Sequence, residues 1–229
     1  MKLFLQNKHP VVSFPEGDFL VDTGSPVSFN YLGIPEIEID GRKYPFIQIV
    51  ACPKETADAL TVGDIAGLIG MDFLKKTGLT IDYENNTLDF SCGMDENDPE
   101  NAAVLSFEYF MGTYMVTSDV TAGRRLKNAI IDTGAPVSYI SARLTSLFEP
   151  TGESYEDFSP EYGVLRGEYR KGMLELNTAS GKRSRSVKLG VMPQLLDLFG
   201  VFDAILGISA LTDKRIVFDF NKRIIRVEL

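Results

Sequence analysis

Residues 21–29 read VDTGSPVSF, and residues 131–139 read IDTGAPVSY. Each stretch consists of an aliphatic residue, Asp-Thr-Gly, a small residue, Pro-Val-Ser and an aromatic residue. The two stretches lie 110 positions apart. A single Asp-Thr-Gly is a weak signal, but two copies inside the same nine-residue pattern indicate an internal repeat.

Two further blocks recur downstream in the same order. Residues 65–74 (IAGLIGMDFL) match residues 203–211 (DAILGISAL), and residues 81–90 (IDYENNTLDF) match residues 218–227 (FDFNKRIIRV). With Gly70 aligned on Gly207 and Asp82 on Asp219, both pairs are 137 positions apart. The chain is therefore expected to consist of two related halves.

The second copy is longer than the first. The spacing grows from 110 to 137 positions, which predicts an insertion of 27 residues at roughly 143–171. The acidic segment 92–101, CGMDENDPEN, carries Gly and Pro and is typical of a linker. We expect a first half over residues 1–96 and a second half, with the insertion, over residues 97–229.

Local patterns predict an all-β chain with a few short helices. Short runs of Val, Ile, Phe and Tyr alternate with turn signals, as in strands joined by tight connections. Residues 36–49 alternate apolar and polar side chains around Asp40-Gly41, which is typical of a type I′ hairpin. Residues 173–191 predict a second hairpin with a longer loop. Short helices are expected at residues 71–76, 141–148 and 193–199.

Charge argues against a nucleic-acid partner. The 229 residues carry a formal net charge of -9, whereas nucleic-acid binding depends mainly on basic groups that neutralise phosphates. A basic run is present, but it is expected to lie in the Gly- and Ser-containing turn of the second hairpin. Its members are Lys182, Arg183, Arg185 and Lys188.

The sequence predicts a globular protein of the cytoplasm with no membrane span. The most apolar stretch, residues 59–74, is interrupted by Asp64 and Asp72 and is shorter than the roughly 20 apolar residues that a span needs. Its N-terminal stretch lacks the pattern of a secretory signal. Cys52 and Cys92 are expected to be reduced thiols, since two cysteines are too few for a disulfide scaffold.

The two Asp-Thr-Gly loops, each followed by an aliphatic-aliphatic-Gly element, resemble the aspartic peptidases. The resemblance covers most of the chain and implies a bilobal, pepsin- or retropepsin-like fold of two pseudo-symmetric small β-barrel halves. Such a chain would be a monomer that acts as an intramolecular pseudo-dimer, as though two retropepsin-like protomers were fused. It would join its halves through an interdomain sheet, with candidate strands at residues 2–6, 88–90, 104–107 and 224–229.

The residues themselves suggest why this pattern would carry chemistry. Apolar strands deliver Asp22 and Asp132 into turns, where Gly permits a close approach of the two loops. Two carboxylates within hydrogen-bond reach cannot both stay ionised, so the pair holds one proton. The ionised member can then activate a water molecule while the protonated member donates to a peptide carbonyl. This chemistry needs no metal and no cofactor.

The resemblance also implies supporting roles around the two aspartates. Thr23 and Thr133 would tie the two loops together by hydrogen bonds across the pseudo-symmetry axis. Gly24, Gly134 and Ala135 would offer backbone groups to the substrate.

One position differs between the two loops. The Ser25 hydroxyl could hydrogen-bond to Asp22, whereas Ala135 at the matching position cannot do so for Asp132. This difference suggests that the two aspartates are not equivalent in protonation.

The region that would cover a cleft is unusual. Residues 30–35 alone separate the first Asp loop from the first hairpin, so we expect no flap in the first half. The insertion contains several aromatic residues and could form either a flap or a packed surface excursion. They are Tyr155, Phe158, Tyr162 and Tyr169. The single histidine, His9, precedes Pro10 in an apparent loop and is expected to be exposed.

Two functions are compatible with these patterns. The first is an aspartic endopeptidase that hydrolyses peptide or protein substrates with Asp22 and Asp132. The second is a peptide-binding or scaffolding protein that keeps the cleft without turnover. Both require the same fold.

Overall fold

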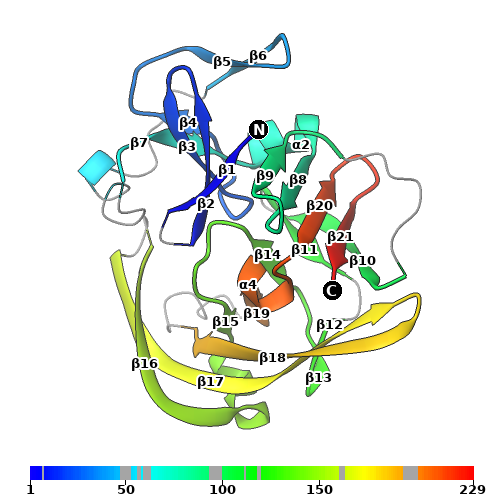
Figure 1. The fold of residues 1–229 in the computed structure, drawn as a ribbon. Coiled ribbons are helices and arrows are strands. Elements are labelled where there is room, and N and C mark those ends of the chain that lie inside the picture. The colour runs from blue at the N-terminus through cyan, green and yellow to red at the C-terminus, as the bar shows by residue number, and fades with distance from the viewer. Residues whose placement is uncertain are drawn as a thin grey trace.

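The computed structural model describes residues 1–6, 8–46, 53–55, 58, 63–92, 100–110, 112–117, 120–159, 163–192 and 201–229. Within these ranges strands far outnumber helices, which confirms the all-β class (Figure 1). The helix expected at residues 193–199, the linker centre at 93–99 and Cys52 lie outside the described residues.

The first half contains a five-stranded sheet in the order β1-β2-β3-β7-β4. A separate two-stranded hairpin, β5–β6, precedes β7 in the chain, and the short helix α2 follows β7. The strands and helix are β1 (Leu3–Gln6), β2 (His9–Phe14), β3 (Gly17–Val21), β4 (Phe29–Asn30), β5 (Glu36–Ile39), β6 (Arg42–Pro45), β7 (Ile65–Ile69) and α2 (Met71–Thr77).

The remaining strands form one large sheet in which β14-β19-β15-β18-β17-β10-β21-β20-β8-β9 is the main path. No sheet among the described residues closes into the small barrels that the resemblance implied. The first members of this sheet are β8 (Leu79–Asp82), β9 (Thr87–Asp89), β10 (Ala102–Phe110), β11 (Thr113–Val116), β12 (Val120–Ala122), β13 (Arg124–Arg125), β14 (Ile130–Asp132) and β15 (Tyr139–Ile140). After the 3-10 helix η1 (Ala142–Leu147) come β16 (Glu149–Ser159), β17 (Gly163–Thr178), β18 (Gly181–Val191), β19 (Ala204–Gly207), the short helix α4 (Ile208–Leu211), β20 (Arg215–Asp219) and β21 (Ile224–Glu228).

The strand pairing reproduces the sequence repeat. In the first half β3 runs parallel to β7, and β4 pairs antiparallel with β7. In the second half β14 runs parallel to β19, and β15 pairs antiparallel with β19. The pair Val21 and Ile69 becomes Ile131 and Leu206, so both offsets of the sequence comparison hold in the sheet register.

A buried serine repeats as well. Ser28 Oγ accepts a hydrogen bond from the Gly70 backbone N–H at 2.8 Å, and Ser138 Oγ accepts one from the Gly207 N–H at 2.9 Å. Each serine ties the segment after the Asp loop to a glycine, Gly70 just after β7 and Gly207 at the end of β19. The Pro-Val-Ser of the repeat therefore has the same structural task in both halves.

The third repeated block joins the two halves. In the turn after β8 the Asp82 carboxylate accepts the Asn85 N–H at 2.8 Å, and in the turn after β20 the Asp219 carboxylate accepts the Lys222 N–H at 2.8 Å. Strands β8 and β20 pair antiparallel with each other, so the hairpins β8–β9 and β20–β21 share one sheet. The sequence comparison identified this block but not the pairing between its two copies.

The predicted interdomain strands are confirmed in part. Three of the four candidates, in β9, β10 and β21, belong to the shared sheet. The fourth candidate, at residues 2–6, is wrong, because β1 pairs with β2 in the five-stranded sheet. It meets the shared sheet through the single bridge between Lys2 and Thr87 and the flanking backbone hydrogen bonds. One continuous hydrophobic core nevertheless contains side chains from both halves, including Phe19 and Phe218.

Both predicted hairpins form, with one difference in turn length. Asp40 and Gly41 take φ values of 51° and 74°, as a type I′ turn requires, and they join β5 to β6. The second hairpin, β17–β18, closes with Thr178 opposite Gly181, so its loop is shorter than expected. The predicted helices at 71–76 and 141–148 appear as α2 and η1.

The basic run therefore does not lie in a turn. It extends along β18, where it pairs with acidic side chains of neighbouring segments. The ion pairs are Lys182 with Glu175, Arg185 with Asp213, and Lys188 with Glu153. No helix of the described residues is long and apolar enough to span a membrane.

The insertion forms the long hairpin β16–β17, which curves along one side of the molecule toward the level of the first-half sheet (Figure 1). Tyr155 and Leu165 are buried in a small apolar cluster. Its other buried members are Val137, Tyr139 and Met192. The described part of the insertion thus packs on the second half, whereas residues 160–162, with Tyr162, lie outside the described residues, as does the side chain of Phe158.

Candidate active site

The two repeated strands bring their aspartates to one point. Asp22 directly follows β3 and Asp132 ends β14. A Cβ atom added at Gly24 would lie 2.3 Å from Asp132 Oδ2, and one added at Gly134 would lie 2.5 Å from Asp22 Cγ. Each loop thus places its glycine against the carboxyl group of the other loop. Only glycine permits this approach, because real Cβ contacts are never so short.

Two threonines lock the loops together symmetrically. Thr133 Oγ1 accepts the Thr23 N–H at 2.9 Å and donates to the Val21 carbonyl at 2.8 Å. Thr23 Oγ1 accepts the Thr133 N–H at 3.1 Å and donates to the Ile131 carbonyl at 2.9 Å. Both threonines are buried, so these four hydrogen bonds satisfy groups that water cannot reach. The tie between the loops that the resemblance implied is present.

A tyrosine that the sequence comparison missed supports this lock from one side. Tyr114 in β11 is fully buried, and its hydroxyl donates to the Ile131 carbonyl. The same hydroxyl lies 3.4 Å from Thr23 Oγ1. Burial raises the pKa of Tyr114 well above its ordinary value, so it remains a neutral donor. Its place in the apolar alternation of β11 resembles that of any core residue, and no sequence signal marked it.

The two aspartates have different backbone donors. Asp22 Oδ1 accepts the N–H groups of Gly24 at 2.7 Å and Ser25 at 3.1 Å. Asp132 Oδ1 accepts the N–H of Gly134 at 2.8 Å, while the Ala135 N–H points to the Asp132 backbone carbonyl at 3.3 Å. The first loop therefore offers one more donor to its carboxylate.

The expected role of the Ser25 hydroxyl is wrong. Its Oγ donates to the Val27 carbonyl at 3.0 Å, and it is the Ser25 backbone N–H that reaches Asp22. A short Ser-Pro-Val turn favours this local bond within the loop. The two loops do differ in the donors that they offer to their own aspartates, but the difference comes from backbone N–H groups and not from the Ser25 hydroxyl.

The predicted substrate-binding residues also have structural tasks. The N–H groups of Gly24 and Gly134 each bind the aspartate of their own loop. The Ala135 carbonyl packs closely on Gly207, where an added Cβ would lie 2.3 Å from it. All three residues lie at the dyad, so the loops that would meet a substrate are shaped by these contacts.

The surroundings of the Asp132 carboxyl group favour its protonated form. Burial, then the charge of Asp22 and a hydrogen bond with its side chain, raise the pKa of Asp132 well above its ordinary value. The backbone N–H groups of Gly134 and Gly24 oppose this rise without cancelling it. Asp132 is therefore the member of the pair whose surroundings favour the protonated form.

The position of His9 differs from the one expected from the sequence. The prediction of an exposed loop residue is wrong, because His9 begins β2 and is only 5% exposed. Neither ring nitrogen has a hydrogen-bond partner among the described residues. Burial lowers the pKa of His9, and the charges of Asp22 and Asp157 together with the Gly134 backbone oppose this effect. A buried imidazole with no hydrogen bond of normal geometry thus lies beside Asp22 and the backbone of Gly134.

Other buried acids have structural partners. Asp203 is buried, accepts the Lys127 N–H at 2.7 Å and pairs with Arg143 at 2.8 Å. It ties the segment before β14 to the segment before β19. Within the described residues, no three His, Cys, Asp or Glu side chains gather as metal ligands would.

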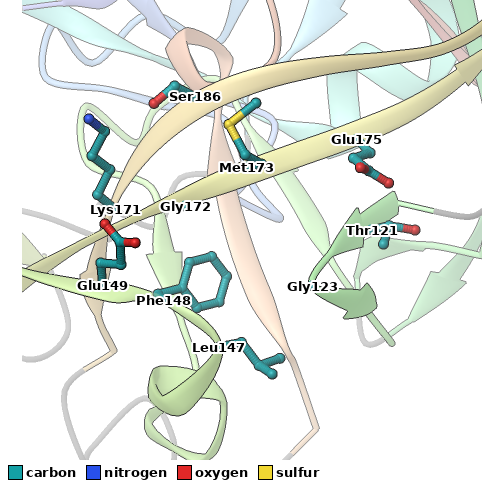
Figure 2. A pocket seen from close by; sticks show the side chains of 10 residues that line it. All are labelled: Thr121, Gly123, Leu147, Phe148, Glu149, Lys171, Gly172, Met173, Glu175 and Ser186. Carbon is teal, nitrogen blue, oxygen red and sulfur yellow. The ribbon is translucent and has the colours of Figure 1, made fainter.

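A separate cavity of about 490 Å³ lies on the second half, away from the dyad loops. Figure 2 shows Leu147 and Phe148 on one side of it, Thr121 and Gly123 on the other, and the strand that carries Gly172 and Met173 running above both. Its remaining lining residues are Glu149, Lys171, Gly172, Glu175 and Ser186. Because none of these residues belongs to the dyad loops, this cavity is not the candidate site.

Chemically, the dyad unites a proton donor and a proton acceptor at one point. Such a pair can remove a proton from water and deliver another to a carbonyl oxygen in the same step. The chain itself matches no protein-family model and no curated protein sequence.

Proposed function

We propose that this chain is a single-chain, retropepsin-like aspartic endopeptidase with a bilobal fold. The observation that carries the proposal is the reciprocal insertion of the two loops, each glycine against the opposite carboxyl group. The threonine lock and the raised pKa of Asp132 support the same conclusion, because they hold two acids where one proton serves both. One chain supplies both aspartates, so a monomer suffices.

The proposed reaction follows from the protonation of the pair. The Asp22 carboxylate takes a proton from a water molecule as its oxygen attacks the carbonyl carbon of a peptide bond. Asp132 gives its proton to the carbonyl oxygen, which yields a neutral tetrahedral diol and leaves the pair singly protonated. Collapse of the diol breaks the C–N bond while Asp22 gives its proton to the leaving nitrogen and Asp132 takes the proton of one diol hydroxyl, which restores the starting protonation of the pair. The overall reaction is the addition of water across one peptide bond.

A digestion experiment tests the proposal. Casein and a peptide library are incubated with the protein at acidic and neutral pH, with and without pepstatin. We expect cleavage that falls by about 10²–10⁴-fold in Asp22→Asn and in Asp132→Asn, as is typical when a general acid or base is lost. Peptides that bind but stay intact would instead support a peptide-binding protein. Cleavage that survives both substitutions would exclude the dyad mechanism.

A further inference from the structure

His9 is a buried polar group that the proposed reaction does not use. It begins β2 and is 5% exposed, and the antiparallel register of β2 with β3, which pairs Val11 with Leu20, brings it level with Asp22 just beyond the end of β3. Neither Nδ1 nor Nε2 makes a hydrogen bond of normal length and angle among the described residues, although the backbone of Gly134 lies close enough to act on the ring. An unsatisfied buried polar group costs roughly 1–3 kcal/mol, so a purely structural role would be better served by an apolar side chain.

The surroundings of His9 come from three different elements. Asp22, in the loop after β3, and Asp157, in β16, both act on the imidazole through their charges, and the backbone of Gly134 approaches it from the second Asp loop. Asp157 is itself held in place, because it accepts a hydrogen bond from the Tyr139 hydroxyl. His9 thus lies where the first half, the second Asp loop and the inserted hairpin meet.

These neighbours restrict what His9 can bind. The charges of Asp22 and Asp157 act on the ring, and Asp132 is paired with Asp22, so an acidic ligand group would be repelled. A neutral imidazole has one N–H donor and one nitrogen acceptor. An extended peptide presents N–H and C=O groups in alternation along each edge, which matches one donor and one acceptor.

We propose that His9 is a substrate-binding residue whose imidazole hydrogen-bonds to the peptide backbone of the substrate beside the scissile bond. This inference deepens the proposed function and rests on it. Because the ligand group is backbone, His9 contributes affinity and alignment without selecting a particular side chain. The stability lost to the unpaired nitrogens in the free protein is regained when the peptide occupies the site.

Kinetics of three variants test the proposal with a peptide that the wild-type protein cleaves. In His9→Ala we expect KM to rise about tenfold, which corresponds to the loss of one hydrogen bond in a buried site, with kcat changed less than about threefold. His9→Gln keeps a donor and an acceptor and should stay within about threefold of wild type in KM. Ser13→Ala, an exposed position on the same strand, is the matched control.

A stability measurement separates substrate binding from a structural role. Thermal unfolding of the free protein should show that His9→Leu is at least as stable as wild type, because it removes unsatisfied buried nitrogens. A large fall in melting temperature in His9→Leu would overturn the proposal. So would an unchanged KM in His9→Ala, in which case cleavage itself would still support the dyad.

The two proposals can fail separately. If the wild-type protein cleaves nothing, calorimetric titration with pepstatin and with the pooled peptide library decides the role of His9 alone. Binding that weakens about tenfold in His9→Ala would keep His9 as a peptide-binding residue while the endopeptidase is rejected. Binding that is unchanged in His9→Ala, or absent in the wild type, would overturn the inference.

Discussion

The two Asp loops share their geometry and differ in their surroundings. Thr23 and Thr133 exchange equivalent hydrogen bonds across the interface, and Gly24 and Gly134 approach the opposite carboxyl groups in the same way. The features that position the carboxyl groups are therefore duplicated. The features that distinguish the carboxyl groups from each other are present once.

The differences are local and chemical. Asp22 receives two backbone N–H donors, while Asp132 receives one from its own loop. Tyr114 supports the lock from the second half, and His9 faces the dyad from the first half. Duplication provides a pair of acids, and these single features make the surroundings of the two acids unequal.

The largest expected effect compares the two threonines. Thr133→Val leaves the buried Thr23 N–H unpaired and should lower the free energy of unfolding by about 2–4 kcal/mol. Thr23→Val should lower it further, because the Tyr114 hydroxyl also loses a neighbour. Urea denaturation measures both, with Thr23→Ser and Thr133→Ser as controls that keep the hydroxyl groups. Equal losses in the two Val variants would show that Tyr114 adds nothing to the lock.

A medium effect concerns pH and the proton on Asp132. The pKa of Asp132 is raised on folding, so the folded protein keeps a proton that the unfolded chain releases, and this contribution to stability is lost as pH rises from about 4 through the raised pKa. Relative to wild type, Asp132→Asn should therefore gain stability as pH rises. Denaturant titrations from pH 4 to 8 measure the difference.

The exposed substitution Asp89→Asn is the control for the loss of one charge. A stability of Asp132→Asn that falls relative to wild type with rising pH would mean that Asp132 is the ionised member. The assignment of the two roles in the proposed reaction would then be reversed.

The smallest expected effect concerns Ser25. Its hydroxyl bonds to the Val27 carbonyl, and Asp22 is reached by the Ser25 backbone N–H, which alanine retains. Ser25→Ala should thus change kcat by less than about threefold and leave its pH profile in place. The reverse change, Ala135→Ser, should be equally mild. If the acidic side of the pH profile of kcat shifts in Ser25→Ala, the hydroxyl acts directly on Asp22 after all.

Features with local signals could be predicted from the sequence. The type I′ turn at Asp40-Gly41 and the two Asp loops follow from backbone preferences that a few neighbouring residues set. Both offsets of the repeat survive in the register of the parallel strand pairs. Local pattern alone therefore identifies Asp22 and Asp132 as the two candidate acids.

Features that depend on distant contacts could not be predicted. His9 precedes a proline, so the sequence suggested a loop residue. In the structure β1 pairs with β2, groups of the second half lie beside the imidazole, and His9 is buried. Tyr114 has no sequence signal, since its hydroxyl meets groups 17 and 91 positions away. The pairing of β8 with β20 is equally long-range, and β1 was placed in the wrong sheet because strand patterns do not name partners.

The joint between β8 and β20 has a consequence for biosynthesis. One edge of β8 pairs with β9 nearby in the chain, but the other edge pairs with Arg215–Asp219, so this part of the sheet forms only after residue 219 has been synthesised. Pairing between strands so far apart in the chain slows folding, and the edges of the early strands stay unpaired until the later strands form. The second Asp loop has the same dependence, because Asp132 pairs with Gly207 of β19, so we expect the two acids to meet late in synthesis as well.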